Sequence, residues 1–87
     1  MAGAVTEAEI RAEILRQTAE RGAEKSICPS EVARALAPAD WRPLMGAVRR
    51  AAAALSAEGT VEILRKGKPI PAEAMHGVVR LRKGPAA

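Results

Sequence analysis

The sequence has almost no aromatic residues: Trp41 is the only one, and the 87 residues include no Phe or Tyr. It also has a single cysteine, Cys28, and a single histidine, His76. One thiol cannot form an internal disulfide, which fits a reducing cytoplasm. One Cys and one His cannot supply the three or four ligands that zinc usually takes. We therefore expect a cytoplasmic protein without a bound metal or cofactor.

Long hydrophobic runs are missing as well, and no segment approaches the 18 apolar residues of a membrane span. Residues 1–9 are acidic and contain no apolar stretch, so they do not resemble a secretory signal. The segment Lys66-Gly67-Lys68 lacks the G-x-x-x-x-G-K-[ST] spacing of a phosphate-binding loop. The sequence pairs no nucleophile with a base, and it contains no set of metal-ligating residues. We therefore predict that the protein is not an enzyme.

What the sequence does contain is alanine and unevenly placed charge. Alanine supplies 20 residues, more than the 17 of Val, Ile and Leu together, and this favours helices in one small domain. Residues 1–40 carry a net charge of −2 and residues 41–87 a net charge of +6. A polarised field of this kind attracts polyanions to one side. The alternative is the unevenness that any chain with 28% charged residues can show.

Two helices are predicted before residue 40. Thr6 and Glu9 match a capping box, and the helix they begin runs to about Arg21, where Gly22 ends it. Its apolar stripe consists of Ile10, Ile14, Leu15 and Thr18. A second helix begins at Pro29 and ends before Pro38. Its predicted buried residues are Val32, Ala35 and Leu36.

A third helix is predicted from a cap at Asp40 to about Glu58, where Gly59 follows it. Its buried stripe is Leu44, Val48, Ala51 and Leu55. Beyond Gly59 the hydrophobic period changes to two, which predicts strands over 60–65 and 78–82. The twelve residues 66–77 between them are predicted to form one long loop. The domain is expected to span 6–83, with loose tails at 1–5 and 84–87.

This order of elements predicts an α+β fold, a winged helix-turn-helix of three helices followed by a β-hairpin wing. Five segments of the chain match a known pattern: Cys28–Leu36, Trp41–Arg49, Ala54–Gly59, Lys66–Pro69 and Gly77–Arg82. On these segments, residues 8–83 resemble a small bacterial winged-helix family of uncharacterised function. The resemblance implies the fold and no activity.

The third helix presents a basic face opposite its apolar stripe. Arg42, Arg49 and Arg50 lie there among small residues: Gly46, Ala53, Ser56 and Ala57. Small residues let a helix approach a groove closely, and guanidinium groups pair with phosphate or a guanine edge. Because this face has no Asn or Gln, we predict phosphate contacts with little base discrimination. The alternative is a solvated face with internal ion pairs.

The predicted wing and its strands are also basic, through Arg65, Lys66, Lys68, Arg80, Arg82 and Lys83. Arg80 and Arg82 are two residues apart and therefore leave the sheet on the same face. The alternative is that these cations only prevent pairing at a sheet edge. We assign Trp41 to the core, Cys28 to a small buried or capping position, and His76 to the surface.

Together these features predict a non-enzymatic module that binds nucleic acid, DNA rather than RNA, through the third helix and the wing. The predicted contacts are Arg42, Arg49, Arg50, Arg65, Lys66, Lys68, Arg80 and Arg82. The alternative function is an adaptor that binds an acidic protein. An apolar groove, with the arginines paired to Asp40, Glu58 and Glu62, would favour the adaptor. We expect no membrane contact, and a monomer or a weak dimer through the first helix.

Overall fold

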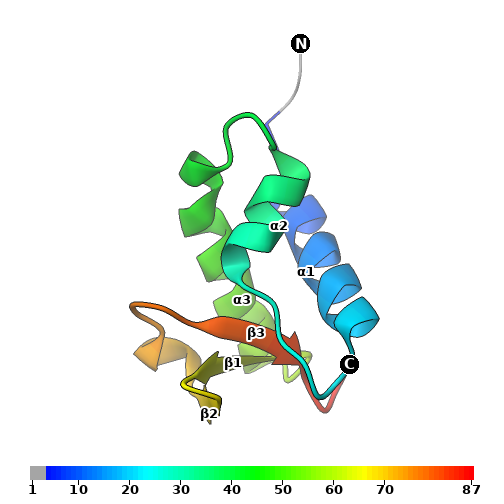
Figure 1. Cartoon of the computed structure of the whole chain (residues 1–87), viewed down its shortest axis with the longest axis vertical. Coiled ribbons are helices and arrows are strands. Elements are labelled where there is room, and N and C mark those ends of the chain that lie inside the picture. Colours follow the sequence, from blue (N-terminus) through cyan, green and yellow to red (C-terminus); the bar gives the residue numbers. More distant parts are fainter. Residues whose placement is uncertain (1–3) are drawn as a thin grey trace.

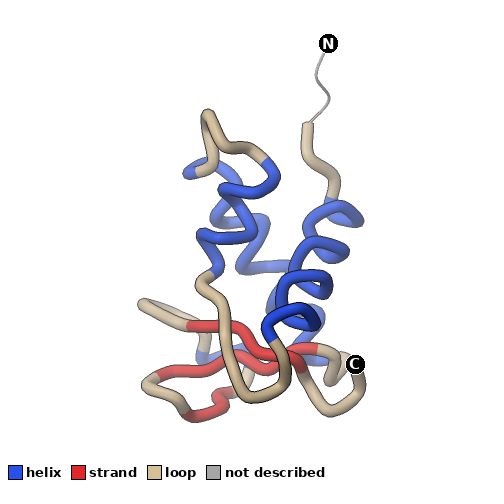
Figure 2. Tube along the Cα trace, turned by 45° about the vertical axis from the view of Figure 1, so that its right-hand side comes forward, coloured by secondary structure: helices blue, strands red, loops and turns tan. Residues whose placement is uncertain are grey.

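The computed structural model describes residues 4–87. Three helices come first and lie together above a three-stranded antiparallel sheet (Figures 1 and 2). The α-helices are α1 (Glu7–Arg21), α2 (Pro29–Leu36) and α3 (Met45–Ala57). The strands are β1 (Val61–Arg65), β2 (Lys68–Ile70) and β3 (Arg80–Lys83), and two 3₁₀ turns are η1 (Arg42–Leu44) and η2 (Ala72–Ala74). The predicted α+β class is confirmed, and the arrangement is consistent with a winged helix.

The capping box predicted at the start of α1 is present. The Glu9 N–H donates to the Thr6 hydroxyl over 3.1 Å, and the Thr6 N–H donates to the Glu9 carboxylate over 2.8 Å. The hydrogen bond from the Thr6 backbone, followed by that from its hydroxyl, lowers the pKa of Glu9 below 4.5. At the other end of α1, Gly22 has φ of 96°, which a residue with a Cβ rarely adopts. Local sequence signals thus determine both ends of this helix.

Two details of the other helices differ from the sequence prediction. In α2, Ala33 is buried and Ala35 is exposed, because this eight-residue helix packs against both α1 and α3 on the Val32–Ala33 side. The third helix does not begin with a cap at Asp40: the turn η1 precedes it, and Asp40 is exposed. Pro43 within that turn has no N–H to donate, which fits a tighter 3₁₀ start.

The core joins the helices to the sheet. Ile14 and Leu55 from the helices pack in one buried cluster with Ile63 and Leu81 from the strands. The segment between α1 and α2 takes part too, because Ile27 pairs with Leu81 through two backbone hydrogen bonds of 2.8 Å each. This pairing covers part of the outer edge of β3.

The wing differs most from its prediction. The strands predicted at 60–65 and 78–82 form at 61–65 and 80–83 and pair with each other, but residues 66–77 are not one loop. Lys66 and Gly67, with φ of 53° and 80°, form a two-residue turn, and β2 returns along β1 to give the order β2-β1-β3. Two successive left-handed residues match the twist of a tight hairpin. Pro69 is tolerated in β2 because this strand lies at the sheet edge.

Both ends of the described chain contact the domain. Val5 packs partly against the core, whereas residues 1–3 of the predicted N-terminal tail lie outside the described residues. After β3, Gly84 is buried and its N–H donates to the Thr60 carbonyl over 3.0 Å. No helix within residues 4–87 is long and apolar enough to cross a bilayer.

Candidate nucleic-acid interface

The basic face predicted for α3 is accessible to solvent. Gly46, Arg50 and Ala57 are exposed, and Arg49 is half-buried, while Val48 and Leu55 on the opposite side are buried. A Cβ placed on Gly46 would lie 3.3 Å from Nη1 of Arg50, so that guanidinium lies across the glycine. The centre of the face therefore has no long side chain of its own, and the guanidinium group of Arg50 covers Gly46.

The three arginines of the third-helix region lie at separate places. Arg49 lies on the sheet side, where its Nη2 donates to the Gly77 carbonyl over 3.1 Å. Arg50 lies on the opposite flank, where it shares a shallow hollow with Val5 and Glu7 at the start of α1. Arg42 lies in η1, at the N-terminal end. The structure thus spreads the three charges around the face and does not gather them at one point.

Trp41 lies at the N-terminal end of the third-helix region, directly before η1. Its side chain is half-buried and packs against the core, as predicted. The guanidinium carbon of Arg42 lies 4.6 Å from the centre of the indole, and that of Arg34, from α2, lies 4.4 Å from it. Cation–π contacts of this kind stabilise by about 0.5–1 kcal/mol at exposed sites. Arg34 could not be predicted to lie here, because its contact with Trp41 depends on how the α2–α3 turn folds.

Backbone carbonyls hold two of the wing cations. Nη2 of Arg65 donates to the carbonyls of Ala74 and His76, over 2.5 and 3.0 Å. Arg80 donates to Ser26, to its hydroxyl over 2.7 Å and to its carbonyl over 2.9 Å. A carbonyl acceptor fixes a guanidinium without neutralising it, so both positive charges remain.

The other wing cations differ in exposure and in ion pairing. Lys66 and Lys68 are exposed on the β1–β2 hairpin, and Lys83 is half-buried. Arg82 forms an ion pair of 2.6 Å with Glu62 on the neighbouring strand. Within residues 4–87, Arg82 is the one candidate among the eight that forms an ion pair with a carboxylate.

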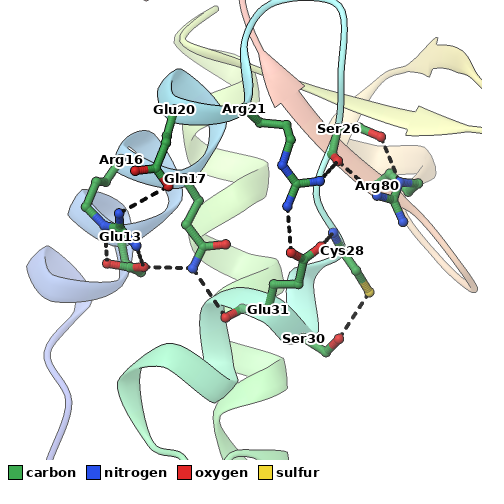
Figure 3. A network of polar contacts seen from close by, with 10 residues as sticks. All are labelled: Glu13, Arg16, Gln17, Glu20, Arg21, Ser26, Cys28, Ser30, Glu31 and Arg80. Atoms are coloured by element: carbon green, nitrogen blue, oxygen red, sulfur yellow. Dashed lines mark hydrogen bonds and ion pairs between the residues drawn. The ribbon is translucent and has the colours of Figure 1, made fainter.

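A polar network positions Arg80 (Figure 3). The Ser26 carbonyl that accepts from Arg80 also accepts from Arg21, over 3.0 Å, and Arg21 pairs with Glu31 over 2.9 Å. Glu31 in turn accepts from the backbone N–H of Cys28 over 2.8 Å. The network therefore connects α1, the start of α2 and β3. Cys28 is half-buried at the N-cap of α2, in line with its predicted capping position.

The pKa of Glu31 lies below 4.5, first because the Cys28 N–H donates to its carboxylate and then because Arg21 does, while burial opposes both. A lowered pKa means that the carboxylate stabilises the fold above pH 4.5 and that this contribution is lost as the pH falls further. We expect Glu31→Gln to lose about 1 kcal/mol at pH 7, a value reduced by solvent exposure, and to show a flatter pH dependence below 4.5.

Urea unfolding between pH 3 and 7 measures this difference. Glu24→Gln is the control, because Glu24 is exposed on the segment that connects α1 to α2 and makes no ion pair within the described residues. An equal pH dependence in the two variants would contradict the role given to Glu31.

An apolar hollow lies beside the wing, and no sequence signal predicts it. It has a volume of about 590 Å³ and lies between the end of β1, the β1–β2 turn and the loop that enters β3. Val78 in this loop is 88% exposed, more than any other large apolar side chain of the described chain. The hollow exists because residues 66–77 fold back on the sheet, which their Gly and Pro content did not reveal.

Residues 4–87 contain no group of three or more His, Cys, Asp or Glu placed to hold a metal ion.

No curated protein matches the chain. A family model described as "Protein of unknown function (DUF3253)" matches residues 7–84, a range that includes all three helices, the sheet and the eight candidate cations. The chain therefore belongs to the DUF3253 family.

Proposed function

We propose that this domain binds duplex nucleic acid, DNA in preference to RNA, through the exposed face of α3 and the β1–β2 hairpin, and that it has no enzymatic activity. One observation carries the proposal: the arginines of α1 form ion pairs, whereas most of the candidate cations form none in the described chain. The carboxylates of Glu13, Glu31 and Glu58 pair with arginines of α1. Seven of the eight candidate cations, on η1, α3, the β1–β2 hairpin and β3, make no ion pair within residues 4–87.

The chemistry of the α3 face supports phosphate contact with little base readout. Its centre consists of Gly46, Ala53 and Ala57, which have no hydrogen-bonding side chain. Arg49 and Arg50 lie on its two flanks, where the two backbones of a groove would run. Contacts to phosphate orient a protein on a duplex, whereas base-edge contacts carry sequence specificity. We infer a binder of low sequence specificity that acts in the cytoplasm as a monomer or a weak dimer.

Fluorescence anisotropy of labelled duplexes of unrelated sequence tests this function. At low salt we expect dissociation constants of roughly 10⁻⁴–10⁻⁶ M, the usual range for non-specific binding, and similar values for different sequences. A DNA duplex and an RNA duplex of matched sequence show which nucleic acid is preferred. The absence of binding to either duplex at 100 μM protein, which is about the weak end of that range, would refute the proposal.

The apolar hollow favours one second function, an adaptor for an acidic protein. Its exposed Val78 and the basic residues beside it could bind an apolar side chain flanked by carboxylates. A pull-down from native extract, with and without nuclease, separates the two functions. Partners that disappear after nuclease treatment support nucleic-acid binding, whereas partners that persist support the adaptor.

A further inference from the structure

The hollow beside the wing has a buried apolar floor and an exposed apolar rim. Leu64 at the end of β1 is 5% exposed and Val79 is 2% exposed, and both line it. Val78, at 88% exposed, lines it too, on the loop that projects beyond η2 and β3 (Figure 1). The volume of about 590 Å³ lies within the range of small-molecule sites, about 300–1,000 Å³.

Three cations line the same hollow: Arg65, Lys66 and Arg80. None of them forms an ion pair in the described part of the chain, and no Asp or Glu is among the lining residues. Carbonyls of the fold hold Nη2 of both arginines in place. A guanidinium has five N–H donors, so each arginine keeps donors that no residue in 4–87 uses.

We propose that this hollow binds a small amphipathic anion: an aliphatic body in the apolar hollow and a carboxylate at the rim, near Lys66 and the two arginines. Burial of the aliphatic body supplies the affinity. The fixed guanidinium groups orient the carboxylate, because their positions need no ordering when the ligand arrives. This site requires no nucleic acid, so it can be tested independently of the proposed function.

A titration of the ¹⁵N-labelled protein followed by two-dimensional NMR tests the site, with hexanoate, octanoate and decanoate as probes below their micelle-forming concentrations. We expect amide shifts confined to residues 64–67 and 76–80 and to Ser26. Each added CH₂ should tighten binding about fourfold while the hollow still covers it. Octan-1-ol and octylamine should bind about fivefold more weakly than octanoate, because they lack the anion.

Two lysines on the hairpin provide a matched pair of variants. Lys66 lines the hollow and Lys68 does not, although both are exposed and lie two residues apart. Lys66→Gln should weaken octanoate binding about threefold, and Lys68→Gln should leave it unchanged. Val78→Ser should weaken every alkanoate without altering the unfolding temperature, because Val78 buries almost no surface.

Several results would overturn the site. They are equal affinities for octanoate and octan-1-ol, equal effects of the two lysine variants, and shifts centred on the shallow hollow near Arg50. Binding of an acidic apolar peptide without binding of octanoate would also overturn it, in favour of a protein partner. Duplex binding measured on Val78→Ser separates this failure from a failure of the proposed function, because Val78 is not among the proposed nucleic-acid contacts.

Discussion

Replacing Arg42, Arg49 and Arg50 together by glutamine is expected to weaken duplex binding on the order of 10²-fold near 0.1 M salt while the domain stays folded. The physical reason is counterion release: each phosphate contact on duplex DNA contributes about 0.9 to the slope of log K against log salt. Loss of all three should therefore lower this slope by about 2.7. Anisotropy titrations at four or five salt concentrations measure both quantities.

Single variants assign the effect to individual residues. Arg50→Gln should lower the slope by about 0.9. Arg16→Gln, at an exposed arginine of α1 that is paired with Glu13, should leave it unchanged. Arg49→Gln should have an additional effect, because Arg49 also holds the Gly77 carbonyl. If instead a variant weakens its preferred sites by about 1–3 kcal/mol and other sequences far less, that arginine reads a base, and the assignment to phosphate is wrong.

The helical half of this fold could be predicted because its signals are local. Thr6 and Glu9 lie within one turn of each other, Gly22 and Gly59 end their helices with positive φ, and Pro29 begins α2. Each of these features works through the backbone of a few neighbouring residues, so no knowledge of tertiary packing is needed. The exception is Asp40, where Pro43 three residues later alters the first turn.

The wing could not be predicted at the same level, because its structure depends on pairing across the sheet. Residues 68–70 contain Pro69 and read as loop, yet they pair with β1 once the turn at Lys66 and Gly67 brings them back. The ion pair of Arg82 could not be predicted for the same reason, because it depends on the strand register. The register places it directly opposite Glu62, and the resulting ion pair removes its charge from the candidate set.

In the candidate site, too, the local features could be predicted and those that depend on tertiary structure could not. The α3 arginines could be placed on one face from helical periodicity alone. The contact of Arg49 with Gly77, the carbonyls around Arg65 and the apolar hollow all depend on how residues 66–77 fold back. The charges could therefore be predicted from the sequence, whereas the groups that orient them could not.

Leu81→Ala is expected to be the most destabilising single substitution considered for this domain. Leu81 is fully buried in β3 and pairs with Ile63 on one side and Ile27 on the other. Truncating a buried leucine to alanine costs about 2–5 kcal/mol, because the cavity closes only partly. For a domain of this size that corresponds to a fall in the unfolding temperature of roughly 10–30 °C. Val78→Ala, on the exposed loop, should change the stability by less than about 0.5 kcal/mol.

The position of Leu81 makes this variant a test of whether helices and sheet unfold together. Leu81 lies in the sheet, whereas Trp41, the only fluorophore of its kind, lies in the turn between α2 and α3. In a two-state domain both probes report one transition. Amide hydrogen exchange of the strand residues and Trp41 fluorescence should therefore report the same loss of stability in Leu81→Ala. If that variant does not fold, Leu81→Val, with an expected loss of about 1 kcal/mol, serves the same comparison. Faster exchange of the strand amides without a shift in Trp41 fluorescence would show that the sheet unfolds separately from the helices, and that the bonds between Ile27 and Leu81 do not couple them.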